Sequence, residues 1–454
     1  MKISKKVSAM SMILGSMLVL NVQGQNWEWA QSAGGKELDY ANGIVNDSDG
    51  NAYVAGSFNG TATFGDKQLT SAGFFDIYIA KYSPAGKVLW VFQAGGSEGD
   101  EAYGLTIDSN NSLYVTGYFS GKATFGDKQL TSLGNRDFFI AKLNPDGKLL
   151  WVQPGGGSED EFGKAITTDN KGNIFVTGIF HTTSTFSKKI ISSKGKEDVF
   201  LANYSTDGNL KWIKSIGGGG RDEATAIEAD ANGNSYLTGW FTGLVDFGKT
   251  KLTASGDDDI FIAKYNSNGE EVWANQAGGF KGADRSYGIT VDPQGNSYIT
   301  GSFNGSAKFS SVSLKSVGAD DFFLAKYNSS GVMQWVKQSG GKNGEIGRAV
   351  DLDAAGNIYV CGDFNASFIP SSTQSIGDWD LFIVKFDTKG NVIGSNQAGG
   401  QGYDRPTAMS IDKNAGVYVT GVFEKTCNFG KQSLTNIGNS DIFIAKAREF
   451  EPAH

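Results

Sequence analysis

Cysteine, histidine and proline are scarce in this 454-residue chain, with 2, 2 and 7 copies. Two cysteines cannot supply the disulfide framework of a small secreted domain. We expect Cys361 and Cys427 to be buried thiols, although an oxidising compartment would permit one bond between them. The two histidines, His181 and His454, are too few and too scattered to build a serine triad or a histidine-rich metal site.

The chain also lacks basic blocks and helical periodicity. Its formal net charge is −8, with 40 basic and 48 acidic residues. Because no cluster of lysine or arginine stands out, nucleic acid is not expected as a partner. No stretch after the N-terminal segment shows a helical period or is apolar enough to span a bilayer, so we expect no transmembrane segment there.

Residues 1–24 have the pattern of a secretory signal peptide. Lys2, Lys5 and Lys6 precede a mostly apolar run over residues 7–20, and small residues follow around Gly24. The pattern predicts removal of this segment and export to the periplasm, the outer cell surface or the medium. We expect one domain over residues 25–448 and a short C-terminal tail over residues 449–454.

Glycine, in contrast, is abundant at 63 residues, and it marks an internal repeat. A motif of Tyr or Phe, an aliphatic residue, any residue and Gly ends at glycines separated by 61, 61, 61, 62, 61 and 59 residues; they are Gly56, Gly117, Gly178, Gly239, Gly301, Gly362 and Gly421. An aspartate that opens an apolar run keeps nearly the same spacing; these are Asp76, Asp137, Asp198, Asp259, Asp321, Asp380 and Asp441. Seven units of about 61 residues therefore fill the chain.

Each unit predicts four strands. In the second unit we expect strands at 102–108, 113–119, 137–143 and 148–153, with a long connecting segment at 120–136. Phe125 and Leu130 are apolar anchors in that segment. Strands that are apolar on both faces need cover on both sides, which sheets packed around an axis provide.

The phase of the repeat predicts ring closure. The sequence from Trp27 to Ala30 matches a fourth strand, and the sequence from Asp441 to Lys446 matches a third strand. We therefore expect Trp29 to pair beside residues 442–445. The predicted fold is all-β: a seven-bladed β-propeller of four-stranded repeats, whose last blade is closed by the N- and C-terminal strands.

The linked motifs resemble the bacterial SBBP repeat, which is named for a seven-bladed β-propeller. They read D-I/F-F-I-A-K-Y, a turn glycine, a tryptophan, A-G-G and D-x-x-G-N-x-Y-V-T-G, and they recur over residues 26–448. The resemblance implies an exported or surface propeller and supplies no catalytic residues. Gly394 departs from the pattern, because the other units have tryptophan there; we expect its blade to be the least tightly packed.

A series of acids precedes the first strand of every unit and is our first candidate ligand site. Its members are Asp39, Asp100, Glu161, Asp222, Asp284, Glu345 and Asp404. If the first strands line a central channel, these carboxylates could surround one mouth and attract a cation such as calcium or a basic partner. The alternative is that each carboxylate caps its own glycine loop.

Departures from the repeat are the second candidate. Trp240 and Trp379 lie off the recurrent tryptophan position and are predicted to contact a partner. Arg221 and Arg285 also break the pattern, as do His181, Asp257, Asp258, Arg348 and Arg405. We expect the long connecting segments and the glycine loops to form the binding face that carries them.

The sequence thus favours an exported, non-catalytic and monomeric propeller that presents loops to a protein or glycan at the cell envelope, without a required cofactor. The alternative is a carbohydrate-active lyase or hydrolase that uses carboxylates at the channel mouth, such as Asp222.

Overall fold

The computed structural model describes residues 27–169, 171–368, 373–448 and residue 450. In this part of the chain the regular structure is entirely β, with no helix and hence none that could cross a membrane. The predicted signal peptide, residues 1–24, lies outside the described residues, as does all of the predicted tail except Phe450.

Four kinds of strand recur in order along the chain. The innermost are β2 (Asp39–Asn46), β6 (Glu101–Ile107), β10 (Glu161–Thr168), β16 (Asp222–Ala229), β22 (Arg285–Val291), β26 (Glu345–Leu352) and β32 (Arg405–Ile411). The second are β3 (Ala52–Phe64), β7 (Leu113–Phe125), β11 (Asn173–Phe180), β17 (Ser235–Phe241), β23 (Ser297–Phe309), β27 (Ile358–Phe364) and β33 (Val417–Phe423).

The third are β4 (Lys67–Tyr82), β8 (Lys128–Leu143), β14 (Asp198–Ser205), β20 (Asp259–Tyr265), β24 (Val312–Tyr327), β30 (Asp380–Phe386) and β36 (Asp441–Ala447). The fourth are β5 (Val88–Gly96), β9 (Leu149–Gly157), β15 (Leu210–Gly218), β21 (Glu271–Gly278), β25 (Met333–Ser339), β31 (Val392–Gly400) and β1 (Trp27–Gly35). Short outer strands follow some second strands; they are β12 (Thr183–Phe186), β13 (Lys189–Ser192), β18 (Leu244–Asp246), β19 (Lys251–Thr253), β28 (Ser367–Phe368), β29 (Thr373–Gln374), β34 (Thr426–Phe429) and β35 (Gln432–Thr435).

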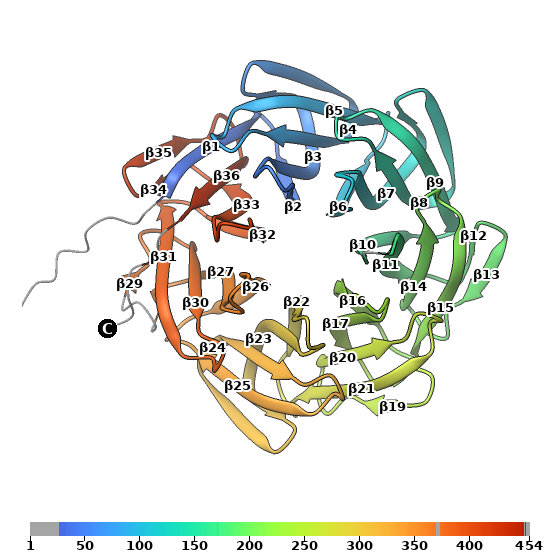
Figure 1. The fold of residues 1–454 in the computed structure, drawn as a ribbon, viewed down its shortest axis with the longest axis vertical. Helices are drawn as coiled ribbons and strands as arrows, with labels where there is room; N and C mark the ends of the chain where they lie inside the picture. The colour runs from blue at the N-terminus through green and yellow to red at the C-terminus, as the bar shows by residue number, and fades with distance from the viewer. Residues whose placement is uncertain (1–26, 170, 369–372, 449, 451–454) are drawn as a thin grey trace, which may run out of the picture.

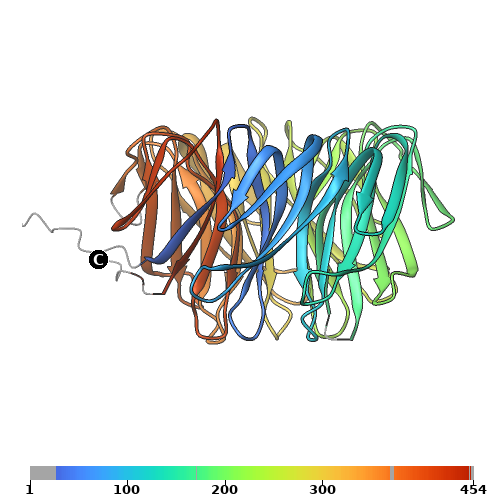
Figure 2. The same cartoon turned by 90° about the horizontal axis from the view of Figure 1, so that it is seen from above.

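Within one unit the four strands pair in order and antiparallel, as in β6–β7–β8–β9. Figure 1 shows the resulting sheets set around a central hollow, with the innermost strands nearest to it, and Figure 2 shows the same arrangement from its edge. This is a β-propeller architecture, and it gives each sheet a neighbour on both faces.

The last sheet joins the two ends of the described chain. Strand β1 pairs with β36, and β36 pairs with β33. In this register Trp29 lies opposite Lys446 and Ala30 opposite Ala445, which confirms the predicted pairing.

The core lies between neighbouring sheets. One cluster joins Tyr53 and Ile79 of one sheet to Val115, Phe119 and Phe139 of the next, all of them almost fully buried. Full burial of a large apolar side chain stabilises a fold by about 1.5–3 kcal/mol. Because the third strands are apolar on both faces, each contributes to two such clusters.

The recurrent tryptophans dock neighbouring sheets onto one another. The indole N–H of Trp90 donates to the carbonyl of Pro145 at 3.2 Å, and its ring covers Gly147 in the same turn. Gly147 has φ +83°, a left-handed conformation that favours glycine. Equivalent bonds join Trp29 to Pro84, Trp151 to Thr206, Trp212 to Ser267 and Trp273 to Ser329.

Gly394 interrupts this series for a reason that the structure shows. The sheet after it is the one formed by both chain ends, so the connecting turn onto which a tryptophan would dock does not exist there. Phe450 lies in the equivalent place instead, with its ring edge-on to Tyr359 at 5.3 Å. Trp27, from the terminal strand β1, belongs to the same core cluster. Its indole donates to the carbonyl of Gln397 at 3.1 Å, and its ring packs edge-on against Phe429 at 5.0 Å.

The connecting segment 120–136, to which the sequence analysis assigned no strand, is mostly β-strand. Strand β7 continues to Phe125 and β8 begins at Lys128, so most of the segment is a hairpin. Its outer part also pairs with the preceding sheet, where Gly95 lies opposite Thr124. Backbone groups that would need water in a loop are therefore satisfied by strand pairing between sheets.

An aspartate holds the turn between the first and second strands. Asp47 accepts hydrogen bonds from the backbone of Asp49 and Asn51 and from the Tyr53 hydroxyl. Its ion-pair partner is Lys81, at 3.6 Å. The recurrent third-strand lysines thus neutralise the turn aspartates rather than the aspartates that open the third strand. Cys361 and Cys427 are both buried free thiols, as expected.

Candidate functional site

The predicted acidic series is buried, not exposed at a channel mouth. Each member is at most 1% exposed. Asp100 shows the common geometry: it accepts hydrogen bonds from the backbone of Gly96 at 2.8 Å and of Ser120 at 3.0 Å. The same glycine bond recurs at Asp39, Glu161, Asp222, Asp284 and Glu345. The capping alternative is confirmed by these bonds, whereas a ligand-binding role for these acids remains a prediction.

Each acid of this series lies beside a second buried carboxylate, the aspartate that opens a neighbouring third strand. Burial raises the pKa of Asp100 to about 7, backbone hydrogen bonds lower it in part, and Asp76 raises it further. Burial likewise raises the pKa of Asp39, Glu161, Asp222, Asp284 and Asp404 to about 7 and that of Glu345 to about 8.

These pairs do not fit calcium. Calcium requires six to eight oxygen ligands, whereas each pair brings only two carboxylates together. Oxygens of both carboxylates already accept hydrogen bonds from the backbone, as Asp100 does from Gly96 and Asp76 does from Ala72. No group of three or more acids, histidines or cysteines among the described residues has the geometry to hold a metal ion.

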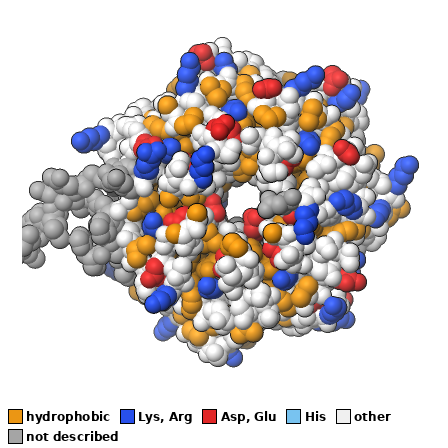
Figure 3. All heavy atoms as spheres, in the orientation of Figure 1, with side chains coloured by type: hydrophobic (Ala, Val, Ile, Leu, Met, Phe, Trp, Pro, Cys, Tyr) orange, Lys and Arg blue, Asp and Glu red, His pale blue; other side chains and the backbone are white. Residues whose placement is uncertain are grey.

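The central channel is lined by the innermost strands and has a volume of about 440 Å³. Figure 3 shows its opening end-on, with acidic side chains beside it. Glu228 and Asp351 lie within the channel, and burial raises their pKa values to about 7 and about 6, with Asp351 raising that of Glu228 further. Sequence analysis missed this pair. The signal was an acid at a repeat position where other units have Val45, Thr106, Thr167, Thr290 or Ser410.

Three of the predicted site residues meet where the innermost strands begin, an end of the channel that we call the channel mouth. The guanidinium carbons of Arg221 and Arg285 lie 5.7 Å and 4.8 Å from the ring centroid of Trp240. Arg221 Nε bonds Glu197 at 2.6 Å, and Arg285 bonds Asp258 through Nε and Nη2. The hydrogen bond that Arg221 donates to Glu197 raises the pKa of Arg221.

Trp240 was predicted to contact a partner directly, and its burial argues for an indirect role. Only 6% of it is exposed, because β17 directs it between the two arginines. The ring is therefore a platform that positions guanidinium groups. The arginine side chains stay accessible, with 55% of Arg221 and 40% of Arg285 exposed.

Other departures from the repeat lie at the same mouth. Trp379 is half-buried, packs against Tyr403 with ring centroids 6.4 Å apart, and approaches Gly344. Arg405 begins β32, at the position that Arg285 occupies in β22. His181 bonds the carbonyl of Asp160 through Nδ1 at 2.7 Å.

Arg136 was missed by sequence analysis. Its guanidinium lies 5.3 Å from the Tyr118 ring centroid and 5.6 Å from that of Phe162. Arg348 repeats this arrangement over Tyr287 at 5.1 Å and bonds Asp363 at 2.5 Å. Comparison of the residue before each third-strand aspartate would have revealed Arg136, since other units have Phe75, Glu197 or Ser440 there.

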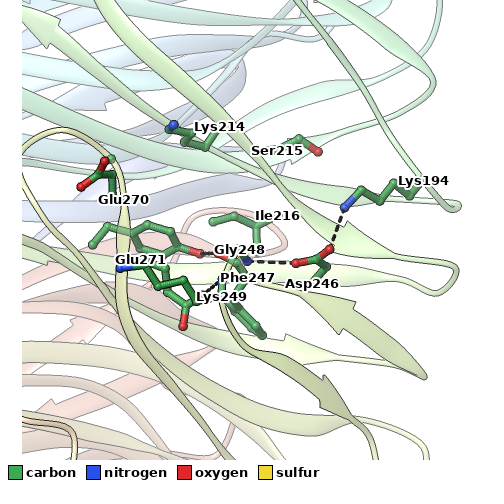
Figure 4. Close-up of a pocket in the computed structure, with 12 residues that line it drawn as sticks. Lys194, Lys214, Ser215, Ile216, Asp246, Phe247, Gly248, Lys249, Glu270 and Glu271 are labelled. Carbon is green, nitrogen blue, oxygen red and sulfur yellow. Dashed lines mark hydrogen bonds and ion pairs between the residues drawn. The ribbon is translucent and has the colours of Figure 1, made fainter.

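A second pocket, of about 370 Å³, lies away from the channel and is structural (Figure 4). Lys194 pairs with Asp246 at 3.5 Å. Glu271 accepts bonds from the backbone of Lys249 and Thr250, and Tyr265 donates to the carbonyl of Phe247 at 2.9 Å. These contacts hold the short β18–β19 hairpin against its neighbour.

Comparison with known proteins gives the following similarities. The chain is 22% identical over 93% of its length to an uncharacterized WD repeat-containing protein, L264, of Acanthamoeba polyphaga mimivirus. It is 25% identical over 70% of its length to the regulatory protein FlaEY of Caulobacter vibrioides. The matched regions span 38% and 35% of these relatives, so the chain matches well under half of each.

Among solved structures, the WD40 β-propeller domain of Doa1 aligns with a TM-score of 0.47 and 10% identity, covering 94% of this chain and 98% of that one. Polysaccharide lyase Uly1 aligns with a TM-score of 0.45 and 9% identity, covering 96% and 94%. The family model described as a beta-propeller repeat, SBBP, matches residues 89–118 and 272–306. The chain therefore contains SBBP β-propeller repeats, which confirms the resemblance drawn from its motifs.

Proposed function

We propose that this chain is an exported, seven-bladed propeller that binds a protein or glycan at the channel mouth and does not catalyse a reaction on it. The carrying observation is that departures from the repeat converge there: Arg221, Trp240 and Arg285 are in contact, Trp379 directly precedes β30, and Arg405 begins β32 at the same end. The features that recur in every unit, such as the docked tryptophans and the turn aspartates, hold the fold together.

The repeat supports a count of seven blades. Each innermost strand begins one four-stranded sheet, and the pairing of β1 with β36 completes the last of them. On this proposal the ring is closed, and the mouth is a rigid frame on which side chains keep their spacing. Rigid frames suit recognition, because less conformational freedom is lost on binding.

An enzymatic role is the second candidate. Glu228 and Asp351 lie together in the channel with raised pKa values, and a carboxylic acid that keeps its proton near neutral pH can act as a general acid. The channel volume of about 440 Å³ limits what could reach them.

A glycan array and a cell-envelope extract, each probed with the wild-type chain and two variants, test the proposal. Arg221→Glu alters the mouth, and Lys148→Glu alters an exposed turn that follows a third strand, at the opposite end. We expect retention by wild type and by Lys148→Glu, and loss with Arg221→Glu. Equal retention by both variants, no retention by wild type, or release of shortened glycan would overturn it.

A further inference from the structure

Arginine is concentrated in one part of the fold. The chain has 40 basic residues but only six arginines. Five of the six, Arg136, Arg221, Arg285, Arg348 and Arg405, precede or belong to strands at the channel mouth. Lysine supplies positive charge nearly everywhere else. A guanidinium differs from an ammonium in being planar, in stacking on aromatic rings and in binding oxyanions through two parallel N–H groups.

Four of these arginines lie over aromatic rings. Arg136 lies over Tyr118 and Phe162, Arg221 and Arg285 over Trp240, and Arg348 over Tyr287, with distances of 4.8–5.7 Å to the ring centroids. Stacking restricts each guanidinium to one plane. The side chain of Arg348 is largely buried and bonds both oxygens of Asp363. The guanidinium groups of Arg136, Arg221 and Arg285, in contrast, are accessible to a ligand. Side chains that are already ordered lose less entropy when a ligand binds.

The ion pairs leave part of this donor capacity unused. The bond between Arg221 and Glu197 uses Nε, so the two terminal amino groups of Arg221 remain available on a side chain that is 55% exposed. Arg136 is exposed and forms no ion pair with any carboxylate of the described residues. Arg405 has a buried Nε without a hydrogen-bond partner in the same part of the chain.

Other aromatic rings at the mouth pack against one another rather than against an arginine. Tyr40 packs against Phe75 with ring centroids 5.6 Å apart, and Trp379 packs against Tyr403 at 6.4 Å. All four are half-buried, so part of each ring faces solvent. Partly exposed aromatic rings offer an apolar surface to the faces of sugar rings.

We propose that the ligand at the mouth is an acidic polysaccharide, one that bears carboxylate or sulfate groups. This inference rests on the proposed binding function. The oxyanions bind the stacked guanidinium groups of Arg136, Arg221 and Arg285, while the sugar rings lie against Tyr40, Phe75, Trp379 and Tyr403. A polymer that has both features along its length matches the two kinds of surface at once, which an acidic peptide of arbitrary sequence does not.

Affinity electrophoresis of the whole exported chain through gels that contain polygalacturonate, dextran sulfate or neutral dextran tests the proposal. We expect retardation by polygalacturonate or dextran sulfate, which identifies the oxyanion as carboxylate or sulfate, and none by dextran. The double variant Arg221→Gln and Arg285→Gln should weaken affinity at least tenfold. Arg136→Gln provides an independent test, since Arg136 has no ion pair to lose and folding should be unaffected.

The matched control removes the same two charges elsewhere, in Lys87→Gln and Lys148→Gln, both exposed in turns that follow third strands. We expect less than a twofold change. Equal weakening by the control and mouth variants would show adsorption by net charge and would overturn the inference. Retention of neutral dextran, or of an envelope protein instead, through the arginine mouth would overturn the acidic-glycan inference and leave the proposed function standing. No mouth-dependent binding of any kind would overturn both.

Discussion

At the residue scale, the paired glycines that end each fourth strand are required by close contacts. A Cβ on Gly96 would lie 1.9 Å from the carbonyl oxygen of Lys122 in the neighbouring sheet. A Cβ on Gly95, where φ is +152°, would lie 2.6 Å from the carboxyl carbon of Asp76. The A-G-G motif was visible in the sequence, but its reason was not, because the contacts depend on how β5 pairs with β4, which carries Asp76, and with β7 of the next unit, which carries Lys122.

Gly96→Ala should therefore destabilise the protein by about 2–3 kcal/mol, because Lys122 must move and strand pairing between sheets is disturbed. Gly99→Ala is the matched control. Its Cβ would have the Tyr118 hydroxyl at 3.8 Å as its nearest neighbour, so the change should be within about 0.5 kcal/mol. Urea denaturation measures both. Equal stability of the two variants would contradict this account of the glycine pair.

The residues at the channel mouth show how far the candidate site could be predicted from the sequence. Trp240, Arg221 and Arg285 were recognisable as departures from the repeat, but their mutual contact depends on three segments that meet only in the fold. For the buried carboxyl pairs, the sequence showed that the acids recur in every unit, but it did not show that they are buried. An acid that follows a glycine loop is equally compatible with an exposed and with a buried position.

At the element scale, the difference between sequence and structure lies in the hairpins between second and third strands. Polar residues alternate with Phe125 and Leu130 in this segment, a pattern typical of a strand with one covered face. Phe125 and Leu130 pack into a core cluster, and the edge of the strand pairs with the glycine end of the preceding sheet, where Ala94 lies opposite Phe125 and Gly96 opposite Ala123. A local reading cannot identify that partner, because it belongs to the previous unit.

Pairing between sheets makes a prediction for the hairpin. Thr124→Pro introduces a proline ring and removes a backbone N–H in the segment that pairs with Gly95. We expect it to lower the free energy of unfolding by about 3 kcal/mol or more. Thr131, in the outer hairpin opposite Lys122, offers the control Thr131→Val, which keeps a β-branched residue and should be nearly neutral. Thermal unfolding followed by circular dichroism compares them. A neutral Thr124→Pro would indicate that the segment is an unpaired loop.

At the scale of the whole molecule, the buried carboxyl pairs make stability depend on pH. In each pair the acid that precedes the first strand has a folded-state pKa of about 7 to 8, and burial also raises the pKa of its partner, such as Asp76. These pKa values lie above those of unfolded acids, so the folded chain binds more protons than the unfolded chain between about pH 4 and pH 7. Stability from these groups is full below the unfolded pKa and is lost as pH rises through the folded pKa. The turn aspartates act oppositely, since hydrogen bonds outweigh burial and lower the pKa of Asp47.

We therefore expect the urea midpoint to be highest near pH 5 and to fall toward pH 8 by the equivalent of several kcal/mol, as one pKa unit corresponds to about 1.4 kcal/mol. Asp100→Asn should reduce this slope, because the amide does not titrate. Asp66→Asn, at a carboxylate that is 73% exposed, should leave the slope unchanged. A midpoint that rises from pH 5 to pH 8 would show that the carboxyl pairs are not protonated in the folded state.

The sequence predicted the repeat, the strand order and the joining of the chain ends, because these follow from spacing and phase alone. It did not predict which end of the channel gathers arginine on aromatic rings, since that depends on the register of every sheet. The central claim is that recurring residues build the propeller and that departures at one mouth bind the ligand.

Hydrogen–deuterium exchange of the whole chain, with and without dextran sulfate or polygalacturonate, tests that claim most directly. The account predicts slower exchange on ligand addition in peptides over residues 133–137, 219–223 and 283–287, and unchanged exchange in the turns at 144–148 and 205–209. Protection confined to those turns, or protection nowhere in the chain, would contradict it.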